Sequence, residues 1–275
     1  MSAESTRKHG VTPGLSQRYA MRTAESHAAF VIPYLDTGMS LLDVGCGPGS
    51  ITLGLAEAVA PGVVVGIDHD PGHVETARAL AADRGVENVS FEVANVYELP
   101  FDDDTFDVAF EHAVFIHLRD PAASARSIFR VLKPGGLLAA RDTEMDGHLI
   151  GNPDPLLEQG YEIFYQWHRH RGSNLKLGKH LRSILSEAGF KDIVGSASYD
   201  PEGAEQDSVR EHGTTMAGLF RGTLAEVALE QGWADTQTLD AIAEKWLEWR
   251  EHPGSFMANA MCEAVGWKPA IGSSD

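Results

Sequence analysis

The stretch "LLDVGCGPGSIT", residues Leu41 to Thr52, carries the strongest signal for the fold of this chain. It begins with apolar residues typical of a buried strand and continues into glycines at every second position, Gly45, Gly47 and Gly49. Glycines permit positive φ angles and let a ligand approach the backbone closely, so such a loop between a strand and a helix is typical of nucleotide binding.

The glycine spacing differs from that of the two common phosphate-binding loops. The dinucleotide fingerprint requires G-x-G-x-x-G, and Ser50 stands where that pattern needs its third glycine. A P-loop requires G-K-[ST], and this segment contains no lysine. The loop therefore favours neither of these two phosphate-binding motifs.

Predicted strands and helices alternate along the chain, beginning with the strand that leads into the loop. We expect strands in the segments "SLLDVG", "VVVGID", "VSFEVAN", "FDVAFEH", "LLAARDT", "KDIVGSASYD" and "SFMANAMCEAVGWKP". Helical patterns separate the first strands, and a further helix is expected over residues 16–35. Alternation of this kind predicts βαβ units and a sheet covered on both faces. The expected fold is α/β: a Rossmann-like, doubly wound, seven-stranded sheet, mostly parallel, with helical cap insertions.

The domain organisation follows from where this alternation stops. Residues 1–15 are polar, with glycines and a proline, and we expect a flexible tail there. No linker long enough to separate domains follows, so residues 16–275 are expected to form a single domain. Its cofactor-binding core would span about 16–142, and its substrate cap would consist of about 145–176 and 202–250.

Composition restricts the classes of partner. The chain has 22 Lys and Arg against 40 Asp and Glu, a net charge of -18, which disfavours nucleic acid and anionic membranes. The two cysteines have no metal-ligand spacing, so we expect no metal site and a reducing compartment. The N-terminus has no apolar signal region, so we expect a cytoplasmic protein. We further expect a monomer or a homodimer.

Polar residues stand at the ends of the first three predicted strands. Asp43 precedes the glycine loop, and Asp68 ends the second strand, 19 residues after Gly49. A carboxylate at that position can accept both hydroxyls of a ribose. Asn95, at the tip of the third strand, offers an amide to an adenine edge, beside the backbone N–H of Val96.

Five segments occur here in the order found in one family: "LLDVGCGPGSIT", "VVGIDHD", "VANVYELPF", "FDVAFEHAVFIHL" and "VLKPGGLLAARD". In this order they resemble the motifs of class I S-adenosylmethionine-dependent methyltransferases, most closely the ubiquinone/menaquinone-biosynthesis type of small-molecule enzyme. The resemblance covers about residues 20–142. It implies that S-adenosylmethionine is the cofactor and S-adenosylhomocysteine the product. This cofactor carries no phosphate, which agrees with the absence of lysine from the loop.

The resemblance also implies roles for individual residues. Gly45 and Gly47 would pack against the methionine part of the cofactor, and Asp43 would orient its ammonium side. Asp68 would take the ribose hydroxyls. The family most often has Asp where this chain has Asn95, and Asn retains an acceptor oxygen there. The remaining predicted cofactor contacts are Tyr19, Arg22, Cys46, His69, Val96, Glu111 and His112.

The reaction predicted from the resemblance is an in-line methyl transfer to a small, apolar or aromatic metabolite. The residue types leave the acceptor atom open between oxygen, nitrogen and carbon. Candidate catalytic residues near the predicted crevice are His112, His117 and Asp142, since each could act as a general base. Candidate substrate contacts are His148, Met216 and Phe220.

Two further functions are compatible with the same fold and cofactor. One is an enzyme that uses bound S-adenosylmethionine without transferring its methyl group, for cyclisation or decarboxylation. The second is a cofactor-binding module without catalysis. Release of S-adenosylhomocysteine during turnover distinguishes methyl transfer from both.

Overall fold

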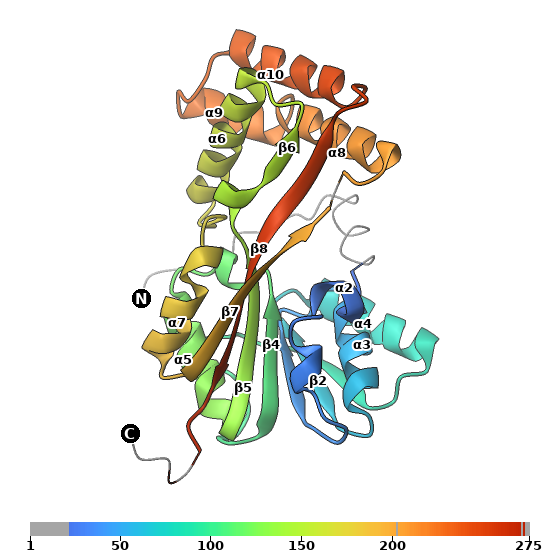
Figure 1. The fold of residues 1–275 in the computed structure, drawn as a ribbon, viewed down its shortest axis with the longest axis vertical. Coiled ribbons are helices and arrows are strands. Elements are labelled where there is room, and N and C mark those ends of the chain that lie inside the picture. Colours follow the sequence, from blue (N-terminus) through green and yellow to red (C-terminus); the bar gives the residue numbers. More distant parts are fainter. Residues whose placement is uncertain (1–21, 202, 271, 273–275) are drawn as a thin grey trace. The chain divides into compact units, whose positions relative to one another are not determined.

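The computed structural model describes residues 22–201, 203–270 and 272 (Figure 1). The described chain divides into two compact units. The first contains the chain up to His112 together with 130–138, and the second contains 113–129 and most of 139–268. The predicted tail and Tyr19 lie outside the described residues.

The first unit is built on parallel strands. Its strand order is β3-β2-β1-β4-β5. The strands are β1 (Leu41–Val44), β2 (Val64–Asp68), β3 (Val89–Val93), β4 (Phe106–His112) and the beginning of β5 (Leu132–Thr143). β1 runs parallel to β2 and β4, and β2 runs parallel to β3. All four residues of β1 are buried, as expected for a strand with helices on both faces.

The helices of the first unit are α2 (Ala24–His27), η1 (Ile32–Tyr34), α3 (Ser50–Val59) and α4 (Pro71–Arg84). α4 begins at Pro71 after Asp70, whose side chain accepts the N–H of Gly72, and ends at Gly85 with φ 65°. These are the start and stop signals that the sequence predicts.

The prediction of a continuous helix over residues 16–35 is wrong for the described part, residues 22–35. Only α2 and the single turn η1 form there. Pro33 prevents a continuous helix through this segment, because proline has no backbone N–H to bond the carbonyl four residues earlier. It lies in η1 and does not account for the end of α2 at His27.

The second unit combines antiparallel strands with a group of helices. The later part of β5 lies in this unit, with strand order β5-β8-β6, and β7 also pairs with β8. β8 (Phe256–Trp267) is antiparallel to both β6 (Leu149–Gly151) and β7 (Lys191–Asp200). The described chain therefore has eight strands rather than the seven expected. The additional strand is β6, three residues long, which is too short to give an alternating pattern in the sequence.

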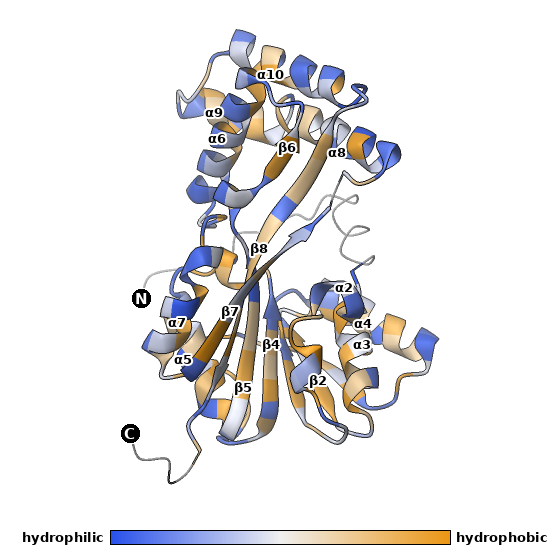
Figure 2. Ribbon diagram, viewed as in Figure 1, coloured by the Kyte–Doolittle hydropathy of each residue, from blue (hydrophilic) through white to orange (hydrophobic). Residues whose placement is uncertain are grey.

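The helical elements of the second unit are η2 (Phe115–His117), α5 (Pro121–Val131), η3 (Met145–Gly147), α6 (Pro155–His170), η4 (Gly178–His180), α7 (Leu181–Ala188), α8 (Gln206–Leu219), α9 (Thr223–Glu230) and α10 (Thr236–Trp249). One hydrophobic cluster joins α6, α8, α9 and α10 and includes Trp246 and Trp249. Figure 2 shows hydrophobic residues concentrated on the strands, while the helices carry residues of both kinds. Among the described helices, none is long and apolar enough to span a bilayer.

Two glycines of the loop have different surroundings. Gly49 has φ 85°, and a Cβ atom there would lie 2.8 Å from the Cβ of Ala77 on α4. Gly47 has φ 53°, and a Cβ atom there would meet no atom within 4 Å. Gly49 is therefore needed for helix packing, whereas Gly47 borders open space.

This difference predicts unequal effects of alanine at the two positions. Gly49→Ala should lower the free energy of unfolding by about 2–4 kcal/mol, because a left-handed backbone and a collision act together. Gly47→Ala should lower it by about 1 kcal/mol, the cost of the left-handed backbone alone. Urea denaturation of both variants measures this, and equal losses would contradict the packing role of Gly49.

Candidate functional site

The carboxyl ends of four strands meet at one edge of the first unit's sheet. Because β1, β2, β3 and β4 are parallel neighbours, their last residues lie side by side. The backbone N–H groups of Gly45 and Cys46 donate to Ile67 O at 2.7 and 2.9 Å, and Ala94 N donates to Asp68 O at 3.1 Å. The structure thus brings the glycine loop, Asp68 and the residues around Asn95 to a common edge, where such sheets bind ligands.

Asp43 is a buried carboxyl on β1. Its side chain is 3% exposed, and its Oδ2 accepts a hydrogen bond of 2.6 Å from Thr52 Oγ1 on α3. Burial raises the pKa of Asp43 to about 7, since the Thr52 hydrogen bond offsets only part of the lost hydration and the charge of Asp68 adds repulsion. A cationic group beside Asp43 would stabilise its charged form.

Asp68 ends β2 and is 7% exposed. Its Oδ1 accepts from Asp70 N at 2.9 Å, and its Oδ2 accepts from Gly47 N at 3.0 Å. Burial alone would raise the pKa of Asp68, but hydrogen bonds from His69, His73 and the Asp70 N–H outweigh burial and hold that pKa below its usual range. Asp68 is therefore a carboxylate at neutral pH.

Two imidazoles contact the same carboxylate. His69 Nδ1 lies 3.2 Å from Oδ1 of Asp68, and His73 Nδ1, in the first turn of α4, lies 3.4 Å from Oδ2. The hydrogen bonds to Asp68 raise the pKa of both histidines. Sequence reasoning missed His73. The signal in the sequence was the position of His73, five residues after Asp68, the acid that ends β2.

Cys46 and Asn95 make local contacts. Cys46 is buried in a cluster with residues of α3, α4 and β3, and burial raises the pKa of its thiol far above the usual range. Such a thiol is not a nucleophile at neutral pH. Asn95 is exposed and its Oδ1 accepts from Tyr97 N at 3.0 Å, a turn contact that leaves its NH2 group directed elsewhere. Val96 is half-buried beside it.

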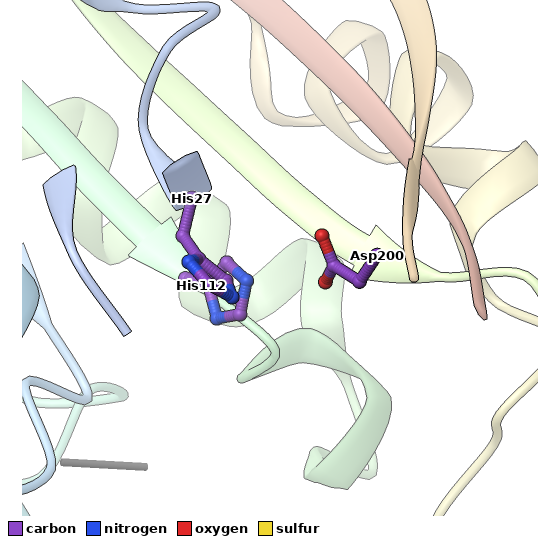
Figure 3. Close-up of side chains that lie close together, drawn as sticks. All are labelled: His27, His112 and Asp200. Atoms are coloured by element: carbon purple, nitrogen blue, oxygen red, sulfur yellow. The ribbon is translucent and has the colours of Figure 1, made fainter. Parts of the chain in front are cut away.

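Glu111 and His112 end β4 next to the glycine loop. Glu111 is fully buried and pairs in register with Val44, the residue before Gly45. His112 is 8% exposed, and its ring meets the ring of His27 edge-on, with centroids 5.3 Å apart (Figure 3). His27 was not predicted from the sequence. Its Nδ1 lies 2.8 Å from Ser26 Oγ, in the short α2 that Thr23 caps.

Three further predicted residues lie in the second unit. His117 is exposed, and its Nδ1 lies 3.0 Å from Ser173 Oγ. Asp142 is fully buried on β5, and its Oδ1 accepts from Ile116 N at 3.5 Å. His148 Nε2 lies 3.3 Å from Thr143 Oγ1.

Met216 and Phe220, the two predicted apolar substrate contacts, are 4% and 1% exposed. Both belong to the hydrophobic cluster of α6, α8, α9 and α10. Their packing there is that of core residues, so contact with a substrate stays a prediction.

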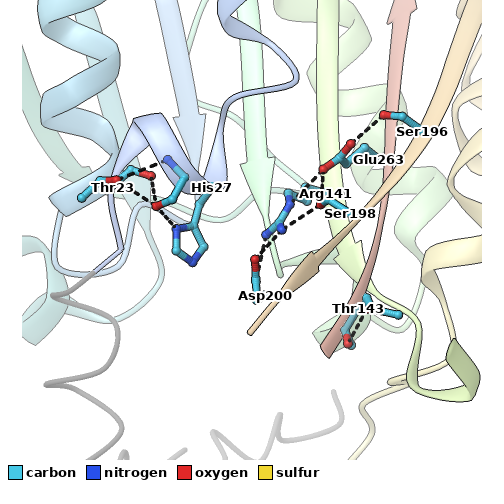
Figure 4. A network of polar contacts seen from close by, with 10 residues as sticks. Thr23, His27, Arg141, Thr143, Ser196, Ser198, Asp200 and Glu263 are labelled. Atoms are coloured by element: carbon cyan, nitrogen blue, oxygen red, sulfur yellow. Dashed lines mark hydrogen bonds and ion pairs between the residues drawn. The ribbon is translucent and has the colours of Figure 1, made fainter. Parts of the chain in front are cut away.

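A buried charge network in the second unit was not foreseen from the sequence. Arg141 on β5 is 2% exposed and contacts Asp200 on β7 and Glu263 on β8 (Figure 4). Its guanidinium Nη2 lies 2.6 Å from Oδ1 of Asp200 and its Nη1 lies 3.1 Å from Oδ2, so the pair is bidentate. Ser196 and Ser198 donate to Glu263. The only signal was a charged residue inside the apolar run "LLAARDT".

The first unit also has a surface depression of about 520 Å³. It is lined by residues of α2, η1 and α3, among them Ser50 directly after the glycine loop, and by Arg84. Of the predicted cofactor residues that the structure describes, none lines it. The site is therefore identified by the strand ends and the glycine loop rather than by this depression.

Comparisons with known proteins find methyltransferases and related folds. A family model described as a methyltransferase domain matches residues 35–189. An uncharacterized methyltransferase of Schizosaccharomyces pombe is 29% identical over 256 residues, covering 88% of this chain and 89% of the relative. A demethylmenaquinone methyltransferase of Lactococcus lactis is 30% identical over 174 residues, covering 56% of this chain and 66% of the relative. The crystal structure of the [4+2]-cyclase SpnF matches with a TM-score of 0.53 and 25% identity, covering 94% of this chain and 80% of that chain.

The raised pKa of Asp43 predicts a specific pH dependence of stability. A carboxyl whose pKa rises on folding costs stability as pH increases from its ordinary pKa, and the loss is complete above the folded pKa of about 7. Asp43→Asn cannot ionise. Its free energy of unfolding, relative to the parent, should therefore increase by about 2 kcal/mol between about pH 5 and about pH 7.

Urea denaturation across this pH range measures the effect. Asp36→Asn, at an exposed position, is the matched control and should show no such trend. A constant difference between Asp43→Asn and the parent at every pH would contradict the assignment.

Proposed function

Since the chain belongs to the methyltransferase-domain family and is an S-adenosylmethionine-dependent methyltransferase, we propose that its acceptor is a small, apolar or aromatic metabolite. The Lactococcus lactis relative is named for demethylmenaquinone, a small organic molecule. The net charge of -18 supports the same choice, because an acidic surface repels nucleic acid.

The observation that carries the cofactor assignment is the position of Asp68 beside Gly47. A buried carboxylate at the end of β2 accepts the Gly47 N–H, and Gly47 itself borders open space. A ribose with two adjacent hydroxyls suits such a carboxylate. The residues present therefore fit the nucleoside part of S-adenosylmethionine.

The acidic residues also fit the cations of the cofactor. When bound, S-adenosylmethionine supplies a methyl group activated by a positively charged sulfur. In our proposal Asp43 becomes fully charged when the cofactor's ammonium lies near, because an opposite charge lowers the pKa that burial has raised. The methionine part of the cofactor would lie beside Gly45 and Gly47 and beside the backbone near Glu111 and His112.

The remaining proposed cofactor contacts are less specific. Asn95 and Val96 would frame the adenine, with the NH2 of Asn95 as donor, since its oxygen already accepts from Tyr97 N. Cys46 supports the loop from its buried position and His69 lies against Asp68. Arg22 is half-buried before α2, and we keep it as a candidate partner of the cofactor's carboxylate.

Among the three candidate bases, the position beside the glycine loop favours His112. It follows Glu111, which is in register with Val44 immediately before the glycine loop. His117 and Asp142 belong to the second unit, whereas His112 belongs to the unit that contains the loop. His112 would take the proton of an acceptor hydroxyl or amine as the methyl group transfers, a task suited to an imidazole near neutral pH.

Cyclisation is the second candidate function. The likeness to SpnF, named a [4+2]-cyclase, favours cyclisation over decarboxylation and over a binding module without catalysis. An enzyme of that kind would convert its substrate without forming S-adenosylhomocysteine.

The ribose assignment predicts a loss of affinity in Asp68→Asn. The variant keeps the shape of the side chain but removes its charge, so two charge-assisted hydrogen bonds of about 1.5–3 kcal/mol each are weakened. The Kd of S-adenosylhomocysteine, measured by calorimetry, should rise at least about tenfold. Asp83→Asn, exposed on α4, is the control. Unchanged affinity in Asp68→Asn would remove the ribose assignment.

The proposed reaction predicts S-adenosylhomocysteine release when a library of small aromatic and apolar metabolites is supplied with S-adenosylmethionine. With the acceptor so found, His112→Gln should lower turnover by at least about tenfold, because a general base is lost. Its affinity for S-adenosylhomocysteine should stay close to that of the parent. Product formation without S-adenosylhomocysteine would favour cyclisation, and equal turnover of variant and parent would exclude His112 as the base.

A further inference from the structure

Both oxygens of the Asp68 carboxylate are covered by neighbouring groups. The N–H groups of Gly47 and Asp70 donate to it, and the Nδ1 atoms of His69 and His73 lie 3.2 Å from Oδ1 and 3.4 Å from Oδ2. A carboxylate offers about four lone-pair positions. Two ribose hydroxyls at Asp68 would therefore compete with groups that already lie against it.

The two backbone donors are held in place. Gly47 belongs to the loop whose Gly45 and Cys46 N–H groups bind Ile67 O. Asp70 is the N-cap residue of α4, with its side chain bound to Gly72 N. Moving either N–H would require the loop or the start of the helix to move.

The two imidazoles are held less firmly than the backbone donors. The His69 side chain is 77% exposed and that of His73 is 22% exposed, against 7% for Asp68. Their distances to Asp68 are 3.2 Å, at the long end for an N–H···O hydrogen bond, and 3.4 Å, beyond the usual range. Rotation about their side-chain bonds exposes one lone pair on each oxygen of the carboxylate.

We infer that His69 and His73 cover the ribose-binding carboxylate in the free enzyme, that the cofactor displaces both imidazoles, and that cofactor affinity consequently rises with pH. The inference rests on the proposed ribose role of Asp68. In this inference His69, proposed above as a cofactor contact, opposes cofactor binding until it leaves Asp68. His69 and His73 then set cofactor affinity without taking part in methyl transfer.

The charges around the imidazoles determine the direction of the pH effect. Asp68 and Asp70 both favour protonated His69 and His73, whereas the charge of His69 disfavours that of His73. The N-terminus of α4 also disfavours a cation at His73. Asp43 on β1 and the thiol of Cys46 also interact electrostatically with Asp68.

The hydrogen bond to Asp68 is the largest cause of the raised pKa of each histidine. When a ribose displaces an imidazole from Asp68, that hydrogen bond is lost. The pKa of the histidine then falls toward its ordinary value, and the histidine releases a proton on cofactor binding. Affinity should therefore rise with pH up to the raised pKa of the free enzyme and become constant above it.

The test is the Kd of S-adenosylhomocysteine, measured by calorimetry at about pH 6 and about pH 8, a range that spans imidazole titration. The parent should bind about tenfold more tightly at the higher pH, as expected for release of about one proton. The double variant His69→Gln/His73→Gln should bind with nearly the same Kd at both pH values. At the lower pH it should bind about tenfold more tightly than the parent. His180→Gln, an exposed histidine of the second unit, should keep the parent's pH dependence.

A second readout is the titration of His73 by NMR with ¹³C-labelled imidazole. Its pKa should fall when S-adenosylhomocysteine is added, and an unchanged pKa would overturn the inference. A double variant that keeps the parent's pH dependence, or that binds more weakly at the lower pH, would also overturn it.

Asp68→Asn separates failure of this inference from failure of the proposed function. If Asp68→Asn loses affinity while the double variant keeps the parent's pH dependence, only the inference about the histidines fails. If Asp68→Asn keeps full affinity, the ribose role fails, and the inference fails with it.

Discussion

The hydrogen bonds to Asp68 are the interactions on which the first unit's ligand edge depends. One carboxylate at the end of β2 holds the N–H of Gly47 in the loop and the N–H of Asp70 at the start of α4. It thereby fixes the loop against the helix, and the close approach of Gly49 to Ala77 joins the same two segments. A carboxylate so placed joins two segments of the fold, and in our proposal the same group accepts the hydroxyls of a ribose.

Both units place charge in buried positions, and they stabilise it in different ways. In the described part of the first unit Asp43 accepts one hydroxyl hydrogen bond, from Thr52, and burial raises its pKa, so we propose that a cationic ligand stabilises its charge. In the second unit Arg141 has full partners in Asp200, Glu263 and Ser198, and this network joins β5, β7 and β8. A buried charge with few hydrogen-bond partners is available to a ligand of opposite charge. A buried charge that is fully paired within the protein fixes the positions of the strands that carry it.

The segments with a strict local pattern were predicted well. The strands from β1 to β5 and the start and end of α4 follow from apolar runs, a proline at the first helical position and a glycine cap. The family and its cofactor follow from the same motifs, because their order along the chain is readable without coordinates. Elements with weak local patterns were not foreseen: β6 has three residues, and Pro33 divides the expected helix near the start of the chain.

The sequence by itself determined the α/β fold class, the glycine loop and the acids at the strand ends, because glycine, proline and strand-end positions act through local backbone geometry. Only the tertiary structure decided the contacts of those acids. His73 reaches Asp68 because α4 packs against the sheet, and His112 meets His27 because β4 lies near α2. Arg141, Asp200 and Glu263 lie on three strands far apart in the chain, so no local pattern could pair them. Side-chain contacts between distant segments depend on packing, which sequence periodicity does not encode.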